Sequence, residues 1–201
     1  MNNLYRCFAL ACLMSSAVSC TTAPVRYYTL SQPPDDTSRA TDTSLLIDVR
    51  VVHTPPALDR TELMVRTGPG EVTLLENERW ASPVTDELKD ATRLELQRRL
   101  GRASGLPPAF TKLTLDIDVQ RFESELGRHA LLAGSWSATL SATSQPSVPA
   151  RTATCTFHAD QKINAGYAGI VEGYQREIAA LAEVIVAALT RQESLTDALC
   201  R

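Results

Sequence analysis

Three stretches in the second half of the chain alternate between apolar and polar residues. Residues 113–120 alternate leucine, isoleucine or valine with polar residues, and residues 136–142 and 152–159 follow the same period. Successive side chains of a strand point to opposite faces, so this period predicts strands with one buried and one wetted face. The three stretches together predict a mostly antiparallel meander.

Two longer stretches have the three-to-four residue spacing that is typical of helices. Residues 83–100 have a broad apolar side, with Ser82 as the predicted N-cap, Pro83 at the first helical position and Gly101 as the stop. Residues 167–191 carry a longer apolar stripe, which predicts a second helix packed on the sheet. The stripe consists of Val171, Tyr174, Ile178, Leu181, Ile185 and Ala188.

The first half of the chain predicts further strands. Residues 25–30 are rich in β-forming residues, and residues 45–52 form an apolar run typical of a strand that is covered on both faces. Residues 62–67 and 71–76 flank Gly68-Pro69-Gly70, which predicts a β-hairpin with a short glycine loop.

The order of these elements predicts an α/β fold. We expect a mixed, largely antiparallel sheet with two main helices packed on it, in two or three layers. The 201 residues suit a single domain over residues 25–191, followed by a C-terminal tail over residues 192–201. An apolar content of 44% excludes a disordered chain, and scattered basic residues with a net charge of −3 provide no nucleic-acid footprint.

The N-terminus has the pattern of an export signal over residues 1–19. One positive charge precedes an uncharged, mostly apolar run over residues 7–18, which is too short to span a membrane stably. The run ends in Ala17-Val18-Ser19-Cys20, which resembles a bacterial lipobox, although leucine is usual where Ala17 stands. We expect lipid on Cys20; the alternatives are the earlier Cys12 or an ordinary signal peptide with an incidental cysteine.

A lipid on Cys20 would hold the domain close to a membrane. Residues 20–24 form a short tether, and three acyl chains make a stable anchor where one would not. Thr21 stands where an aspartate would retain a bacterial lipoprotein in the inner membrane. This residue therefore favours the periplasmic face of the outer membrane.

Two cysteines remain once the signal is removed and Cys20 carries lipid. Cys155 and Cys200 would lie in an oxidising compartment, which favours a disulfide between the C-terminal end and the strand that contains Cys155. The alternative is a buried Cys155 thiol and a free Cys200.

Nothing in the sequence predicts an enzyme. The three histidines show no metal-binding spacing, and no nucleophile elbow or phosphate-binding glycine loop occurs. Asp116 and Asp118 share the polar side of a predicted strand, as His158 does on another, and a solvated face explains them. We therefore expect no cofactor and no metal apart from the covalent lipid.

The segment from Pro55 to Trp80 carries a family resemblance. It reads PPALDRTELMVRTGPGEVTLLENERW, and its most specific pieces are Leu58-Asp59-Arg60, Met64-Val65-Arg66 and Arg79-Trp80-Ala81. With the YYTL strand and the last helix, it resembles the PqiC-like family of ABC-type transport auxiliary lipoproteins, from about Tyr27 to Leu189.

The resemblance implies a non-catalytic accessory subunit on the outer membrane. The other parts of such a transporter would be a permease, an ATPase and an MCE-domain protein that bridges the periplasm and moves lipid between membranes. The expected partners are the MCE-domain protein and its permease, and a ring-like homo-oligomer is compatible with this role. A lipid-binding holder and a structural lipoprotein of the envelope are the alternatives.

Charged and aromatic residues near the hairpin are the candidates for partner binding. Trp and Arg are favoured at interface hot spots. The alternative places Trp80 in the core under the helix, with Asp59 and Arg60 stabilising a turn. The candidate residues are Asp59, Arg60, Arg66, Arg79 and Trp80.

Overall fold

A computed structural model describes residues 23–32, 44–101, 110–142 and 150–190. The predicted signal peptide, Cys20, Cys200 and the tail lie outside the described residues. The elements, in chain order, are β1 (Arg26–Tyr28), β2 (Leu45–His53), the short 3₁₀ helix η1 (Pro56–Leu58), β3 (Glu62–Gly68), β4 (Glu71–Trp80), α2 (Val84–Leu100), β5 (Thr111–Glu125), β6 (His129–Ala142), β7 (Arg151–Lys162) and α3 (Tyr167–Thr190).

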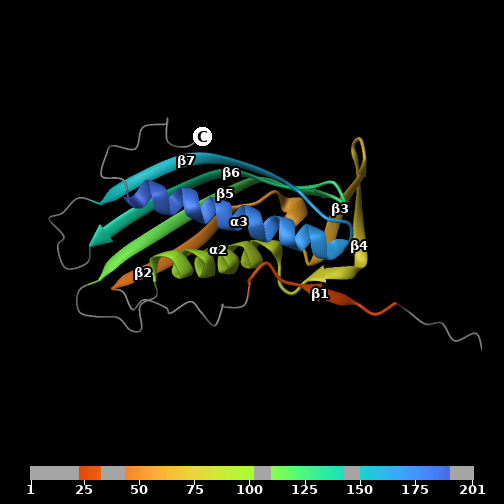
Figure 1. Cartoon of the computed structure of the whole chain (residues 1–201), viewed down its shortest axis with the longest axis horizontal. Coiled ribbons are helices and arrows are strands. Elements are labelled where there is room, and N and C mark those ends of the chain that lie inside the picture. The colour runs from red at the N-terminus through yellow and green to blue at the C-terminus, as the bar shows by residue number, and fades with distance from the viewer. Residues whose placement is uncertain (1–22, 33–43, 102–109, 143–149, 191–201) are drawn as a thin grey trace, which may run out of the picture.

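The strands form one mixed, seven-stranded sheet, with α2 and α3 lying on the same face of it (Figure 1). β5, β6 and β7 are antiparallel neighbours, which is the predicted meander. β2 pairs with β5 in parallel, and β4 pairs with β3 antiparallel and with β1 in parallel. The predicted α/β class is therefore confirmed, and the molecule has two layers.

The core lies between the sheet and the helices. The alternation in β5 places Leu113 and Leu115 at 0% exposure on the helix-facing side, as the period of two predicts. On α3 the predicted apolar stripe is buried. Gly173 brings this helix close to the sheet, because a Cβ added there would lie 3.0 Å from Cβ of Ala130 on β6 and 2.5 Å from Cγ2 of Ile163, just after β7.

The prediction that β2 is covered on both faces is wrong. Ile47 and Val49 are buried, but Asp48 and Arg50 point to the opposite face and form ion pairs across the β2–β5 ladder. The prediction failed because the apolar run contains two charged residues whose side chains point to the other face of the sheet. Their partners are Lys112, 2.9 Å from Asp48, and Asp116, 2.6 Å from Arg50.

The start of α2 also differs from the prediction. Pro83, rather than Ser82, is the N-cap, and no side chain caps the helix there. The buried carboxylate of Glu87 instead accepts hydrogen bonds from the backbone N–H and hydroxyl of Ser82, at 3.1 and 2.8 Å. It also accepts one from the backbone N–H of Leu30, at 2.8 Å, so it fastens the chain after β1 to the first helix.

Candidate docking site

Along one edge of β5 the strand pairing has a gap between the part that pairs with β2 and the part that pairs with β3. β2 pairs with β5 as far as Asp118, and β3 meets the same edge at Glu125. The chain leaves the sheet between these points to form η1, and β5 bulges between Val119 and Arg121. The interruption opens a groove of about 310 Å³.

The walls of this groove are largely apolar. Leu58 of η1 and Phe122 of β5 line it on the body of the protein, and Met64 and Val72 line it on the β3–β4 hairpin. Met64 pairs with Leu74 and Arg66 pairs with Val72 across the hairpin, so these side chains share one hairpin face. Val72 is 50% and Leu74 is 42% exposed, which leaves that face open.

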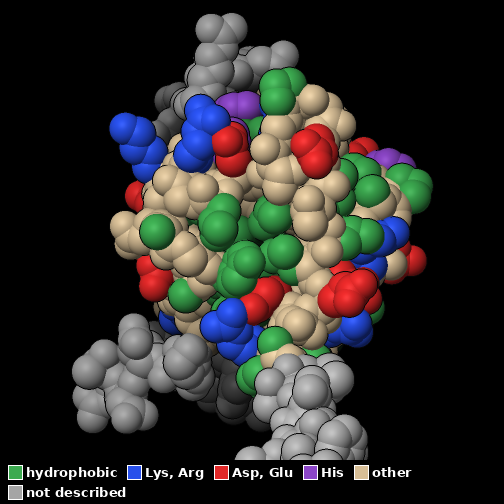
Figure 2. Space-filling model, turned by 90° about the vertical axis from the view of Figure 1, so that its right-hand side faces the viewer, with side chains coloured by type: hydrophobic (Ala, Val, Ile, Leu, Met, Phe, Trp, Pro, Cys, Tyr) green, Lys and Arg blue, Asp and Glu red, His purple; other side chains and the backbone are tan. Residues whose placement is uncertain are grey.

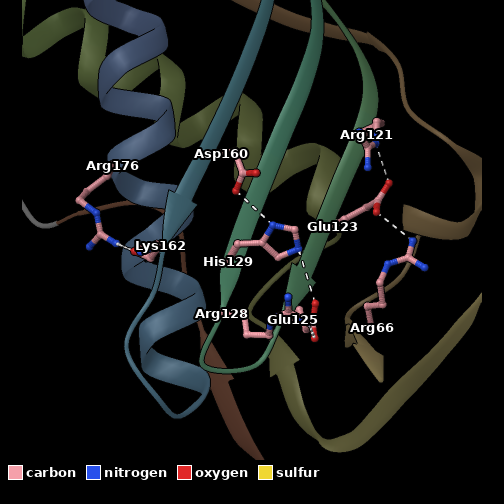
Figure 3. A network of polar contacts seen from close by, with 9 residues as sticks. All are labelled: Arg66, Arg121, Glu123, Glu125, Arg128, His129, Asp160, Lys162 and Arg176. Carbon is pink, nitrogen blue, oxygen red and sulfur yellow. Dashed lines mark hydrogen bonds and ion pairs between the residues drawn. The ribbon is translucent and has the colours of Figure 1, made fainter. Parts of the chain in front are cut away.

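Charged side chains stand at the rim. Glu123 accepts hydrogen bonds from Arg121 at 2.8 Å and from Arg66 at 2.9 Å (Figure 3). The bond from Arg121, with the contribution of Arg66, lowers the pKa of Glu123 to about 2 against the opposing effect of its partial burial. The rim therefore carries two cations that share one carboxylate.

A second polar cluster lies next to this one on the open side of the sheet (Figure 3). His129 is 3.1 Å from a carboxylate oxygen of Asp160 and 4.0 Å from one of Glu125, which also pairs with Arg128. Among the described residues no group of three or more histidine, cysteine or acidic side chains is arranged to hold a metal ion. The cluster is a set of polar contacts, in which His129 reaches Asp160 across the strands and Arg128 forms an ion pair with Glu125 in the β5–β6 turn.

The predicted partner-binding residues fall into different environments. Arg66 is at the groove, and Asp59, at the end of η1, is exposed. Arg60 is half-buried, and its Nε is buried with no hydrogen-bond partner in the described part of the chain. Arg79 is 3.5 Å from Glu62 and donates to the backbone of β4.

Trp80 lies in the core at 2% exposure. Its ring meets Phe122 edge-on, with centroids 6.1 Å apart, and Tyr174 in the same manner at 6.3 Å, while Phe122 and Tyr174 stack at 3.9 Å. This aromatic cluster supports the floor of the groove, because Phe122 belongs to both. The packing favours the core interpretation of Trp80, and its contact with a partner stays a prediction.

A comparison of the sequence with models of known families identifies the family of this chain. The family model described as "ABC-type transport auxiliary lipoprotein component" matches residues 28–186, which is most of the chain. The chain belongs to this family. Its members are auxiliary components of ABC-type transport, as the family's description states, and the resemblance of the 55–80 segment is confirmed.

A solved structure shares the fold of this auxiliary lipoprotein, and a second one matches it more weakly. A crystal structure of an uncharacterized protein is 18% identical, with a TM-score of 0.60, and the match covers 84% of this chain and 100% of that one. Protein XCC0632 from Xanthomonas campestris, assigned to DUF330, is 21% identical with a TM-score of 0.49, over 81% and 92% of the two chains. No protein with a curated description matches the chain.

Two further features of the auxiliary lipoprotein concern its placement in the envelope. Neither described helix has the length and apolar character needed to cross a bilayer. Cys155 is buried on β7 at 5% exposure, whereas Cys200 is outside the described residues, so the disulfide between them stays a prediction.

The sequence did not reveal the β5 side of the groove. Arg121, Phe122 and Glu123 are more than 50 residues from Arg66 in the chain and reach it only through the sheet. One signal was present: the apolar positions of β5 are odd-numbered up to Val119 and then shift to Phe122. A shift of that kind indicates a bulge.

Removing the rim carboxylate should lower stability at neutral pH only. For Glu123→Gln we expect a loss of about 1–2 kcal/mol at pH 7, because two charge-assisted hydrogen bonds are lost from a partly exposed site. A carboxyl whose pKa is lower in the folded than in the unfolded protein stabilises the fold at pH values above its unfolded pKa. The stability difference between the variant and wild type should therefore vanish as the pH falls from about 4.5 to about 2. Urea unfolding at pH 7 and pH 2.5 measures this, and Glu172→Gln, on the exposed side of α3, is the control. An undiminished difference at pH 2.5 would contradict the ion-pair assignment.

Proposed function

We propose that this auxiliary lipoprotein is a non-catalytic subunit, anchored to the periplasmic face of the outer membrane through Cys20. It docks an MCE-domain bridging protein, and with it the permease, so that lipid can pass between the two membranes. The observation that carries the proposal is the family match over residues 28–186. The lipobox-like sequence that precedes the matched region supports the anchor.

The groove and its rim support docking as the mechanism. An open apolar wall beside fixed cations is the composition of a protein interface, in which a desolvated centre has a polar border. Asp59 and Arg66 lie on this side of the protein, since Leu58 of η1 and Arg66 both line the groove. A segment that brings apolar side chains, a carboxylate on the side of Arg66 and a cation on the side of Asp59 would be complementary to it.

Reversing the charge at Asp59 should weaken partner capture without unfolding the protein. In a mild-detergent pull-down of the full-length protein from its own membranes, we expect wild type to recover an MCE-domain protein and its permease. Asp59→Lys should recover several-fold less, because one contact pair at an interface contributes about 1–3 kcal/mol. Mass spectrometry identifies and quantifies the captured proteins.

The matched control for that experiment is Glu183→Lys, which makes the same charge change at an exposed position of α3. It should capture as much partner as wild type. Capture of only peptidoglycan-associated or outer-membrane assembly proteins by wild type would contradict the proposed function. Equal losses for both variants would contradict the placement of the interface.

A second candidate function is that of a lipid-binding holder, which the volume and apolar walls of the groove favour. Native mass spectrometry of the protein purified from membranes distinguishes the two functions. A co-purified phospholipid that is lost in a Val72→Asp variant, which changes an exposed residue of the groove wall, would favour the holder, and its absence would favour docking alone.

A further inference from the structure

Five large apolar side chains are exposed at one end of the molecule. They lie on β1 or directly before it, on the β3–β4 hairpin and in the turn between β5 and β6, the elements at the right of Figure 1, which we call the hairpin end. Exposed aliphatic and aromatic residues gathered in one place mark an interaction surface, whereas single ones need no explanation. They are Val25 at 44%, Tyr27 at 67%, Val72 at 50%, Leu74 at 42% and Leu126 at 44%.

The strands spread these residues across the hairpin end. Tyr27 of β1 pairs with Arg79 of β4, whereas Val72 lies near the other end of the same strand, seven residues or about 23 Å away. Leu126 follows Glu125, which pairs with Arg66 of the hairpin. Figure 2 views the molecule from this end, where hydrophobic side chains gather at the centre and charged side chains surround them.

The N-terminal chain leaves the protein at the same end. Ala23 is the first described residue, and β1 begins three residues later. Three residue spacings separate Ala23 from Cys20, so whatever path the chain takes, the lipid-bearing residue lies within about 11 Å. An anchor on that residue therefore holds the hairpin end, rather than the far end of the helices, against the membrane.

We propose that the hairpin end is a membrane-contacting surface, whose apolar residues enter the interfacial layer of the lipid leaflet that holds the anchor. This proposal rests on the lipid anchor at Cys20. Interfacial segments bury apolar side chains roughly 5–10 Å into the headgroup boundary. Tyr27 is suited to that layer, because its ring is apolar and its hydroxyl is polar.

The proposal gives the two sides of the hairpin different partners. Leu63 and Val65 face the core at 1% and 5% exposure, whereas Leu74 would face lipid. Val72, which also lines the groove, would lie at the border between the lipid and the docked segment. Contact with lipid would orient the long axis of the molecule away from the membrane, because α3 begins next to β1: the guanidinium of Arg26 is 5.8 Å from the ring centroid of Tyr167. The other end of α3 would then point into the periplasm.

The test uses tryptophan as a depth probe in the full-length lipoprotein. We would compare Val72→Trp with Val184→Trp after reconstitution into phosphatidylethanolamine–phosphatidylglycerol vesicles with brominated acyl chains, which quench only nearby indoles. Val184 is a matched control: it is 41% exposed, and it lies 17 residues along α3 from Tyr167, roughly 25 Å at the helical rise. The native Trp80 and Trp136 are 2% and 1% exposed, so the wild-type protein provides the baseline.

We expect the added emission of Val72→Trp to shift to the blue and to be quenched by the brominated lipid. That of Val184→Trp should stay unquenched. Equal emission from both probes in brominated and ordinary vesicles would overturn the proposal. So would a blue shift of Val72→Trp without quenching, because that result indicates that protein, such as a second copy, covers the hairpin end.

The intact mass of the same preparation separates this proposal from the proposed function. Protein that carries three acyl chains but shows no quenching at position 72 would overturn the membrane contact and leave the anchor standing. Protein without any lipid would overturn both the anchor and the membrane contact that rests on it.

Discussion

Replacing Trp80 by alanine is expected to cost about 3–5 kcal/mol of folding free energy, which is a large share of a small domain's total stability. The ring is 2% exposed and packs edge-on against both Phe122 and Tyr174, so its removal leaves a cavity bounded by two rings that hold each other in place. Urea unfolding followed by circular dichroism measures the loss.

Trp80→Phe is the conservative variant for this experiment and should lose clearly less, because most of the aromatic packing survives. The same measurement separates the two interpretations of Trp80. A variant that keeps wild-type stability but no longer captures its partner would contradict the core assignment. A destabilised variant that captures its partner normally at low temperature would exclude Trp80 from the interface.

The second large effect concerns Glu177, a residue of α3 that is buried at 0% exposure. Neither of its carboxyl oxygens has a hydrogen-bond partner in the described part of the chain. Burial raises the pKa of Glu177 to about 9; the nearby backbone N–H of Gln161 opposes the rise, Asp160 adds to it and Arg176 opposes it. The carboxyl is therefore neutral in the folded protein at pH 7, whereas it is ionised in the unfolded chain.

This difference gives stability a pH slope of known sign. A carboxyl whose pKa is higher in the folded than in the unfolded protein stabilises the fold fully at pH values below its unfolded pKa of about 4.5. Above that pH its contribution to the free energy of unfolding falls by about 1.4 kcal/mol per pH unit, until the pH reaches about 9. For Glu177→Gln, which cannot ionise, we expect stability relative to wild type to rise by about 3 kcal/mol between pH 4.5 and pH 7.

Urea unfolding at intervals from pH 4.5 to pH 9 checks that expectation. Glu172→Gln is the control, because it removes an exposed carboxyl from the same helix and should leave the slope of wild type unchanged. A constant difference between Glu177→Gln and wild type across this range would show that the buried carboxyl does not titrate as its surroundings require.

The sequence predicts correctly those helices and strands that bury one face and expose the other. The alternation in β5 and the stripe on α3 predicted their type and burial, since a single core covers the helix-facing side of the sheet. β2 was misjudged because a run of apolar residues that includes Asp48 and Arg50 can also alternate. Only the cross-strand partners Lys112 and Asp116, distant in sequence, reveal which face is polar.

The candidate site was predictable only on its hairpin side. Arg66 and Asp59 were found because a short segment holds both, whereas Arg121 and Glu123 join them through a parallel contact that no local pattern encodes. Trp80 shows the converse limit. An aromatic residue between charged neighbours suits either an interface or a core, and only the positions of Phe122 and Tyr174 distinguish them.

Within the described part of the chain β2 pairs with β5 alone, which has a consequence for the export that the proposed anchor requires. A chain that crosses the inner membrane from its N-terminus delivers Arg50 to the periplasm 66 residues ahead of Asp116, its ion-pair partner on β5. The β3–β4 hairpin can close locally in that time, but β2 has no strand to pair with until β5 emerges. On the proposed export route its apolar side chains would therefore remain exposed during translocation, and a chaperone that shields extended apolar segments would act on this strand first.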